Sequence, residues 1–341
     1  MLNQSRYRLP ALLLAALLAL PGATLAAKQV WNFNMFGPPR AVTKGIEVMK
    51  AKMEAAGKGE FELNIQYGSV LGPEKQIPDG IKIGAFEAGQ VCAGYYPNKF
   101  PLLSVMELPF LAPRTLRERA KVEAEVLSHP AIVKEMRDRW NIRYIAPAFL
   151  PAYEFMGNKR IAKAEDMKGV KMRISGLNAE ALQVFGAVPT MVTAPEGYQA
   201  LERGTIDSFG FPWTYAFGAY KMYEVSKYAT EGLGMSGFMC FQGVNKDAYD
   251  RLPDSVKNVV NAAQQDATEA LVIAYEADDK KWYPIFEKKL EVVKFPPAER
   301  ARVAKGSEKF WLDWAKEQDA AGRPGTEILN FAKAQVAKYA K

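Results

Sequence analysis

The sequence is poor in the side chains that metal sites and many catalytic sites require. It has one histidine, His129, and two cysteines, and it has no closely spaced cysteine pair. We therefore expect no metal site and no cofactor. It also lacks a Gly-x-Ser-x-Gly elbow and a glycine-rich phosphate loop, and His129 precedes Pro130 in a charged helical region, a poor setting for a general base. These absences argue against an enzyme.

The two cysteines, Cys92 and Cys240, are far apart in the sequence and each has apolar neighbours. Free cysteine in such a context behaves as a small buried hydrophobic residue. We therefore expect two buried thiols on strands, although an oxidising compartment would permit a disulfide.

Only one long hydrophobic run occurs, and it lies near the start of the chain. Arg6 and Arg8 precede an apolar run at 12–20, and small residues follow up to residue 27. The run is shorter than the roughly 20 residues that span a bilayer. Segment 1–27 is thus predicted to be a cleaved export signal, so that a periplasmic chain begins near Ala27 or Lys28.

Charge and length set broad limits on the mature chain. The formal net charge of +7 falls to about +5 without Arg6 and Arg8. Such a balance slightly favours small anionic ligands and gives little reason to expect nucleic acid as a partner. About 315 residues remain, which is enough for two domains.

Strand and helix patterns alternate along the chain, which indicates an α/β fold with mixed sheets flanked by helices. From residue 253 apolar residues recur at steps of three and four, which predicts one long helix to about residue 286 that joins two lobes. We expect lobe I at 28–149, completed by about 237–270, and lobe II at 150–236, completed by about 271–341. The predicted elements are strands at 29–36, 61–67, 88–93, 143–149, 170–174, 187–190 and 208–211, and helices at 46–56, 115–140, 178–185, 195–203 and within 297–341.

Three segments together resemble the DctP-type solute receptors of tripartite ATP-independent periplasmic (TRAP) transporters. They are GSVLGPE at 68–74 with IKIGAFE at 81–87, DMKGVKMR at 166–173 with FGAVP at 185–189, and EGYQALERGTID at 196–207. The resemblance covers essentially the whole mature chain. It implies a two-lobed periplasmic binding protein fold, similar to type II, which closes on a small organic carboxylate and docks on membrane permease subunits. We expect the receptor to be a monomer.

The same resemblance identifies Arg173 as the residue that binds the ligand carboxylate. Arg173 ends a predicted strand with apolar neighbours, and we expect its head to emerge at the sheet edge over the cleft. A guanidinium is a permanently charged planar fork that matches a carboxylate with two parallel hydrogen bonds. The alternative is an ordinary salt bridge, at the surface or between the lobes.

Two departures from the family pattern narrow the range of ligands that we expect. Many relatives have a second arginine at the position aligned with Tyr153 and an asparagine at that aligned with Phe211. The relatives that bind through a metal have an acidic residue near Gly210 and Phe211. Because these groups are missing, we expect Arg173 to be the only strong charged anchor and the ligand to be a monocarboxylate.

Aromatic residues follow several predicted strands and predict an apolar pocket for an aromatic or branched hydrophobic acid, with or without a keto or hydroxy group. Asn34 is a further candidate, as a polar contact from the opposite lobe. Each aromatic residue has the alternative of being ordinary core. The candidate ligand-binding residues are Arg173, Phe211, Trp213, Tyr153, Tyr95, Tyr96, Phe149, Asn34 and Phe209.

Two other functions remain open from the sequence. A receptor that serves a sensor or a chemotaxis partner needs the same closed-state surface as one that serves a permease. An exported α/β enzyme is the weaker alternative, since no catalytic constellation is found.

Overall fold

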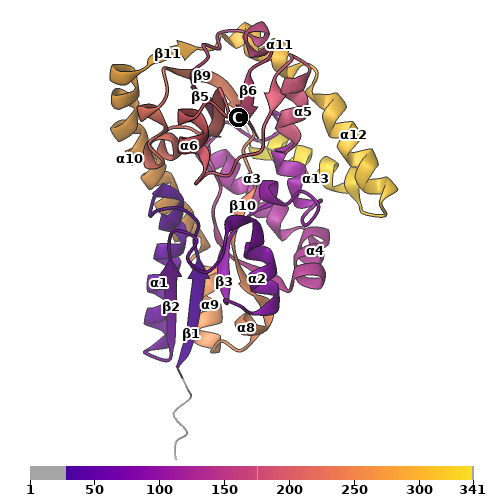
Figure 1. Ribbon diagram of the computed structural model, residues 1–341. Coiled ribbons are helices and arrows are strands. Elements are labelled where there is room, and N and C mark those ends of the chain that lie inside the picture. The colour runs from indigo at the N-terminus through magenta and orange to yellow at the C-terminus, as the bar shows by residue number, and fades with distance from the viewer. Residues whose placement is uncertain (1–27, 175, 340–341) are drawn as a thin grey trace, which may run out of the picture.

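Two mixed β-sheets organise the chain, which is described here by a computed structural model over residues 28–174 and 176–339 (Figure 1). The predicted export signal at 1–27 lies outside the described residues. The five-stranded sheet has the order β2-β1-β3-β10-β4, and the six-stranded sheet has the order β11-β9-β5-β8-β6-β7. The strands are β1 (Gln29–Asn34), β2 (Phe61–Gln66), β3 (Ala88–Cys92), β4 (Ile142–Pro147), β5 (Tyr153–Gly157), β6 (Lys171–Arg173), β7 (Val188–Pro189), β8 (Ser208–Pro212), β9 (Tyr228–Met235), β10 (Cys240–Asn245) and β11 (Glu291–Lys294).

Helices cover the five-stranded sheet because their apolar residues recur on one face. In α1 (Lys44–Gly57), Ile46, Met49 and Met53 are fully buried, and the helix packs on β2 and on two later helices. A residue in the left-handed conformation, Lys58, ends α1, and Gly84 likewise ends α2 (Ile77–Ile83). Such C-terminal caps satisfy the last carbonyls of a helix.

The predicted α/β character is confirmed, but two long helices are divided. Pro130 splits the expected helix at 115–140, because proline favours the first turn of a helix, and the His129 side chain accepts a hydrogen bond from Ala131 at its start. The long helix breaks at Ala263. The remaining helices are α3 (Leu116–Ser128), α4 (Pro130–Trp140), α5 (Leu177–Gln183), α6 (Gly197–Glu202), α7 (Tyr215–Ala219), α8 (Lys246–Asp250), α9 (Asp254–Ala262), α10 (Gln264–Lys289), α11 (Pro297–Ala304), α12 (Ser307–Ala320) and α13 (Gly325–Tyr339).

We propose that each sheet is the centre of one lobe, lobe I around the five-stranded sheet and lobe II around the six-stranded one. The chain crosses between the sheets at 148–152 and again at 236–239. Helix α10, of 26 residues, is about 39 Å long, and it packs against α1 in lobe I and against α7 and β11 in lobe II. The C-terminal helices contact both regions, since α12 packs on α5 and α13 on α3 (Figure 1).

The expectation of two free thiols is wrong, because Cys92 and Cys240 form a disulfide. Strands β3 and β10 pair in antiparallel fashion with Cys92 directly opposite Cys240, and their Cα atoms are 4.1 Å apart. The pairing joins residues 148 positions apart, so local sequence context could not reveal it. The bond ties the start of β10, which follows the 236–239 crossing, to the centre of lobe I.

No helix within 28–174 or 176–339 combines the length and the apolar character that a membrane span needs.

We expect the double substitution Cys92→Ala and Cys240→Ala to lower the free energy of unfolding by about 2–4 kcal/mol, because the bond restricts a long loop of the unfolded chain. Urea denaturation of both proteins measures the difference. Dithiothreitol should destabilise the wild type and leave the variant unchanged. Detection of two free thiols in denatured, unreduced protein would contradict the assignment.

Candidate functional site

A cavity lies between the lobes, next to the disulfide; about 290 Å³ there is not occupied by atoms, and part of this space is open to solvent. Both sheets and the crossing segments contribute to its wall. It is lined by Phe36, Arg40, Gln90, Cys92, Tyr95, Leu150, Tyr153, Ala194, Phe211, Pro212, Tyr215, Tyr220 and Phe238. Most of this surface is aromatic, with a few polar groups, as in typical small-molecule sites.

Arg173 lies directly behind this wall and is completely buried. Its Nε donates to the Val192 carbonyl and its Nη1 to the Gly210 carbonyl, both at 2.9 Å. Its Nη2 has no hydrogen-bond partner among the described residues. One edge of the guanidinium is thus fixed by lobe II, and a further donor remains for an acceptor.

Three aromatic rings surround this guanidinium. Its Cζ lies 4.6 Å from the ring centre of Phe209, 5.5 Å from that of Phe211 and 5.2 Å from that of Phe238. Phe209 and Phe211 alternate along β8, so both face the same side of the sheet. The head is therefore enclosed by rings, because Phe238 from the 236–239 crossing covers it.

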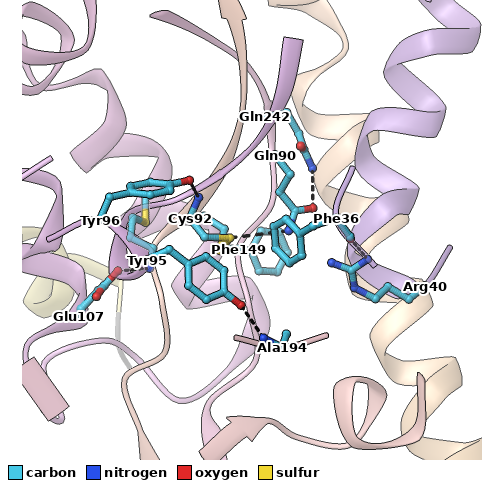
Figure 2. The surroundings of a disulfide bond; sticks show 12 residues. Phe36, Arg40, Gln90, Cys92, Tyr95, Tyr96, Glu107, Phe149, Ala194 and Gln242 are labelled. Atoms are coloured by element: carbon cyan, nitrogen blue, oxygen red, sulfur yellow. Dashed lines mark hydrogen bonds between the residues drawn. A yellow bond between two sulfur atoms is a disulfide. The ribbon is translucent and has the colours of Figure 1, made fainter. Parts of the chain in front are cut away.

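Tyr95 joins the two lobes across the cavity. It follows β3 in lobe I, and its hydroxyl oxygen accepts a hydrogen bond of 3.1 Å from the backbone N–H of Ala194 in lobe II (Figure 2). The hydroxyl proton remains available for donation to a further acceptor. This hydrogen bond therefore joins the two lobes directly.

The tyrosine hydroxyls at the cavity are neutral and can donate hydrogen bonds. Burial raises the pKa of Tyr153 to about 12, although the positive charge of Arg173 opposes this effect. Burial also raises the pKa of Tyr95, Tyr215 and Tyr220. A ligand oxygen entering the cavity would therefore meet several hydroxyl donors as well as guanidinium groups.

Of the residues predicted from the sequence, Tyr95, Tyr153 and Phe211 line the cavity, and Arg173 and Phe209 lie behind it. The others lie elsewhere. Trp213 packs against Phe217, Tyr283 and Phe286.

Three further predicted residues are engaged in the protein interior. Phe149 packs against Tyr275, and the Tyr96 hydroxyl accepts a hydrogen bond from the Cys92 N–H at 2.9 Å (Figure 2). Asn34 donates to the Gly72 carbonyl at 2.9 Å, and its Oδ1 has no partner among the described residues. None of the three belongs to the cavity wall.

Sequence reasoning does not identify four polar residues of the wall, namely Arg40, Gln90, Tyr215 and Tyr220. Arg40 matters most for the prediction, because we expect Arg173 to be the only strong charged anchor, whereas Arg40 is a second charged residue at the wall. The only local sign is its place shortly after a strand, beyond Gly37-Pro38-Pro39. Loops at strand ends commonly carry binding residues.

Glu107, on the 3-10 helix Leu103–Glu107, is a buried acid beside the same site. Its Oε1 accepts a hydrogen bond from the Met239 N–H at 3.0 Å, which connects it to the 236–239 crossing. Burial raises its pKa to about 8, against the opposing effect of the hydrogen bonds from the Met239 and Gly94 amides and the charge of Arg173.

Comparisons with known families and with known proteins both find similarity to bacterial solute-binding proteins. The family model described as bacterial extracellular solute-binding protein, family 7 (DctP), matches residues 34–318. The C4-dicarboxylate-binding periplasmic protein DctP of Rhodobacter capsulatus is 36% identical over 270 residues, which are 77% of this chain and 79% of that protein. A monocarboxylate 2-oxoacid-binding periplasmic protein of Nostoc sp. is 24% identical over 237 residues, 68% of this chain and 64% of that one.

Solved structures share the fold. A TRAP solute-binding protein from Rhodoferax ferrireducens, in complex with copurified benzoate, has a TM-score of 0.81 at 23% identity, covering 92% of this chain and 98% of that one. A marine metagenome TRAP protein specific for aromatic acid ligands, in complex with metahydroxyphenylacetate, has a TM-score of 0.80 at 24% identity, covering 92% of this chain and all of the other.

The raised pKa of Glu107 predicts a pH dependence of stability. The ordinary pKa of this carboxyl group is 4.5. Between pH 4.5 and about pH 8, the folded chain therefore keeps a proton on Glu107 that the unfolded chain has lost. The free energy of unfolding should therefore fall as the pH rises through this window. Glu107→Gln should make that fall shallower.

Urea denaturation at about pH 5 and about pH 8 tests this expectation. Glu60→Gln, at an exposed position, is the matched control and should keep the wild-type slope. An unchanged slope in Glu107→Gln would contradict the assignment.

Proposed function

Since the chain belongs to the DctP family of bacterial extracellular solute-binding proteins, the receptors of TRAP transporters for small organic acids, we propose that its own ligand is an aromatic or hydrophobic monocarboxylate. The observation that carries this proposal is the unpaired Nη2 of buried Arg173 among three aromatic rings. A carboxylate would supply the missing acceptor and a compensating charge. An aromatic or branched apolar group would fit the surrounding rings.

The cavity wall supports an aromatic ligand body. Phe36, Tyr95, Phe211 and Phe238 present rings to it from both lobes and the crossing segment. The Rhodoferax protein with the same fold holds benzoate, and the marine metagenome protein is specific for aromatic acids. Tyr95 and Tyr153 would donate to a ligand keto or hydroxy oxygen.

We propose that binding proceeds by closure of lobe I onto a ligand first held by lobe II. Arg173 and both carbonyls that orient it, those of Val192 and Gly210, belong to lobe II. Closure then brings Tyr95 to the Ala194 amide. Ligand contacts made only in the closed form shift the population toward it.

The family is periplasmic and its members deliver their ligands to membrane permease subunits. For this chain we propose export by the cleaved segment 1–27, action as a monomer, and recognition of the closed form by the permease.

Arg173→Ala should weaken binding of benzoate, used as a probe, by about 100-fold or more, equivalent to about 3 kcal/mol, because the carboxylate loses a charged and desolvated partner. Arg173→Lys should restore part of the affinity, since lysine keeps the charge without the planar fork. Titration calorimetry of the purified proteins measures both effects.

Arg203→Ala is the matched control, since this arginine is exposed and belongs to the same lobe. It should bind benzoate as the wild type does. Equal affinity of wild type and Arg173→Ala would refute the assigned role, and tighter binding of acetate than of benzoate would refute an aromatic ligand.

A further inference from the structure

Arg40 brings a second guanidinium to the cavity, from lobe I. It is 8% exposed, and its Nη1 donates to the carbonyls of Phe36 and Pro38, both at 2.8 Å. These carbonyls fix the side chain without neutralising its charge. Among the described residues Arg40 takes part in no ion pair within 4.0 Å, and the Nε and Nη2 of its guanidinium make no hydrogen bond, while its backbone N–H donates to Thr43 Oγ1 at 3.4 Å.

Tyr220 of lobe II completes the surroundings of this guanidinium. The Arg40 Cζ lies 5.6 Å from the centre of the Tyr220 ring, and the Tyr220 hydroxyl is buried with no partner among the described residues. Gly37 permits this approach, because a Cβ added there would lie 2.1 Å from the Tyr220 oxygen. The two lobes thus meet at a cation and a hydroxyl donor with unused hydrogen-bonding capacity.

The positive charges of Arg40 and Arg173 act on the same part of the cavity. Burial raises the pKa of Tyr220, and both guanidinium groups oppose that rise, Arg40 more strongly than Arg173, whereas the charge of the buried Glu74 carboxylate adds to it. The Nη2 of Arg173 and the Tyr220 hydroxyl are buried polar groups without a hydrogen-bond partner among the described residues, which is unfavourable. One carboxylate at Arg173 would leave the Tyr220 hydroxyl unsatisfied, and the Nε and Nη2 of Arg40, which make no hydrogen bond to the described residues, lie beside that ring.

We propose that Arg40 and Tyr220 form a second polar subsite that binds an oxygen substituent of the ligand, such as a hydroxyl or oxo group, at a distance from its carboxylate. This inference rests on the proposed function, because Arg173 must hold the carboxylate. The ligand class becomes an oxygen-substituted aromatic acid. Arg40 determines specificity by favouring substituted over unsubstituted acids, since a site built to hydrogen-bond an oxygen discriminates against analogues that lack it.

Calorimetric titrations with benzoate, 3-hydroxybenzoate and 4-hydroxybenzoate test the subsite. We expect the wild type to bind at least one hydroxybenzoate about 10-fold more tightly than benzoate. Arg40→Met should weaken hydroxybenzoate binding more than benzoate binding and so remove this preference. The matched control is Arg143→Met, because Arg143 also belongs to lobe I and lies over a tyrosine ring, that of Tyr249, outside the cavity.

Arg40→Met also removes the contacts to Phe36 and Pro38, so thermal unfolding of each variant is compared with the wild type. Tyr220→Phe is the second variant, since it deletes a hydroxyl and keeps the ring. It should reduce the same preference even if Arg40→Met does not fold.

The subsite is refuted if the wild type shows no preference, if Arg40→Met weakens benzoate and hydroxybenzoates equally, or if the folded variants keep the full preference. Failure of the proposed function gives different results: the wild type binds no aromatic acid, or Arg173→Ala binds benzoate with wild-type affinity. Either result would also refute the subsite.

Discussion

The fully buried charge of Arg173 is the constraint on which the arrangement of the site depends. Burying an ionised group is costly unless polar partners replace its water. Here two carbonyls of lobe II accept hydrogen bonds from the guanidinium, and three aromatic rings lie close to it. These groups replace part of the water that the charge loses. Because the carbonyls belong to the same lobe as the arginine, lobe II alone orients the guanidinium fork.

Strand geometry explains why these groups meet. Arg173 on β6 pairs in register with Phe209 on the neighbouring strand β8. Alternation then places Phe211 on the same face as Phe209, while the intervening Gly210 supplies a carbonyl. A Cβ at Gly210 would lie 3.0 Å from the Phe155 ring and 3.2 Å from the Arg173 carbonyl, so a larger residue there would need these neighbours to shift by a few tenths of an ångström.

Sequence periodicity predicted much of the fold and part of the site, and the limits have physical causes. The spacing of apolar residues predicts helix α1 and strands β1 to β3, and the resemblance of a short motif identifies Arg173. Both signals lie within short stretches of the sequence. The Cys92–Cys240 bond and the meeting of Arg40 with Tyr220 depend on pairing between distant segments, which no local pattern encodes. Trp213 was assigned to the pocket from its closeness in sequence to Phe211, but it packs toward α10.

The place of β10 in the first sheet has a consequence for the order in which the chain can fold. This strand lies between β3 and β4, and its first residue, Cys240, follows Cys92 by 148 positions. A chain that emerges N-terminus first therefore presents β5 to β9 of the second sheet before the first sheet can be joined. Neither sheet is therefore completed by one continuous stretch of chain, since the first sheet needs β10 to join β3 to β4 and the second needs β11 to pair with β9. The crossing at 236–239 becomes fixed when β10 enters the first sheet.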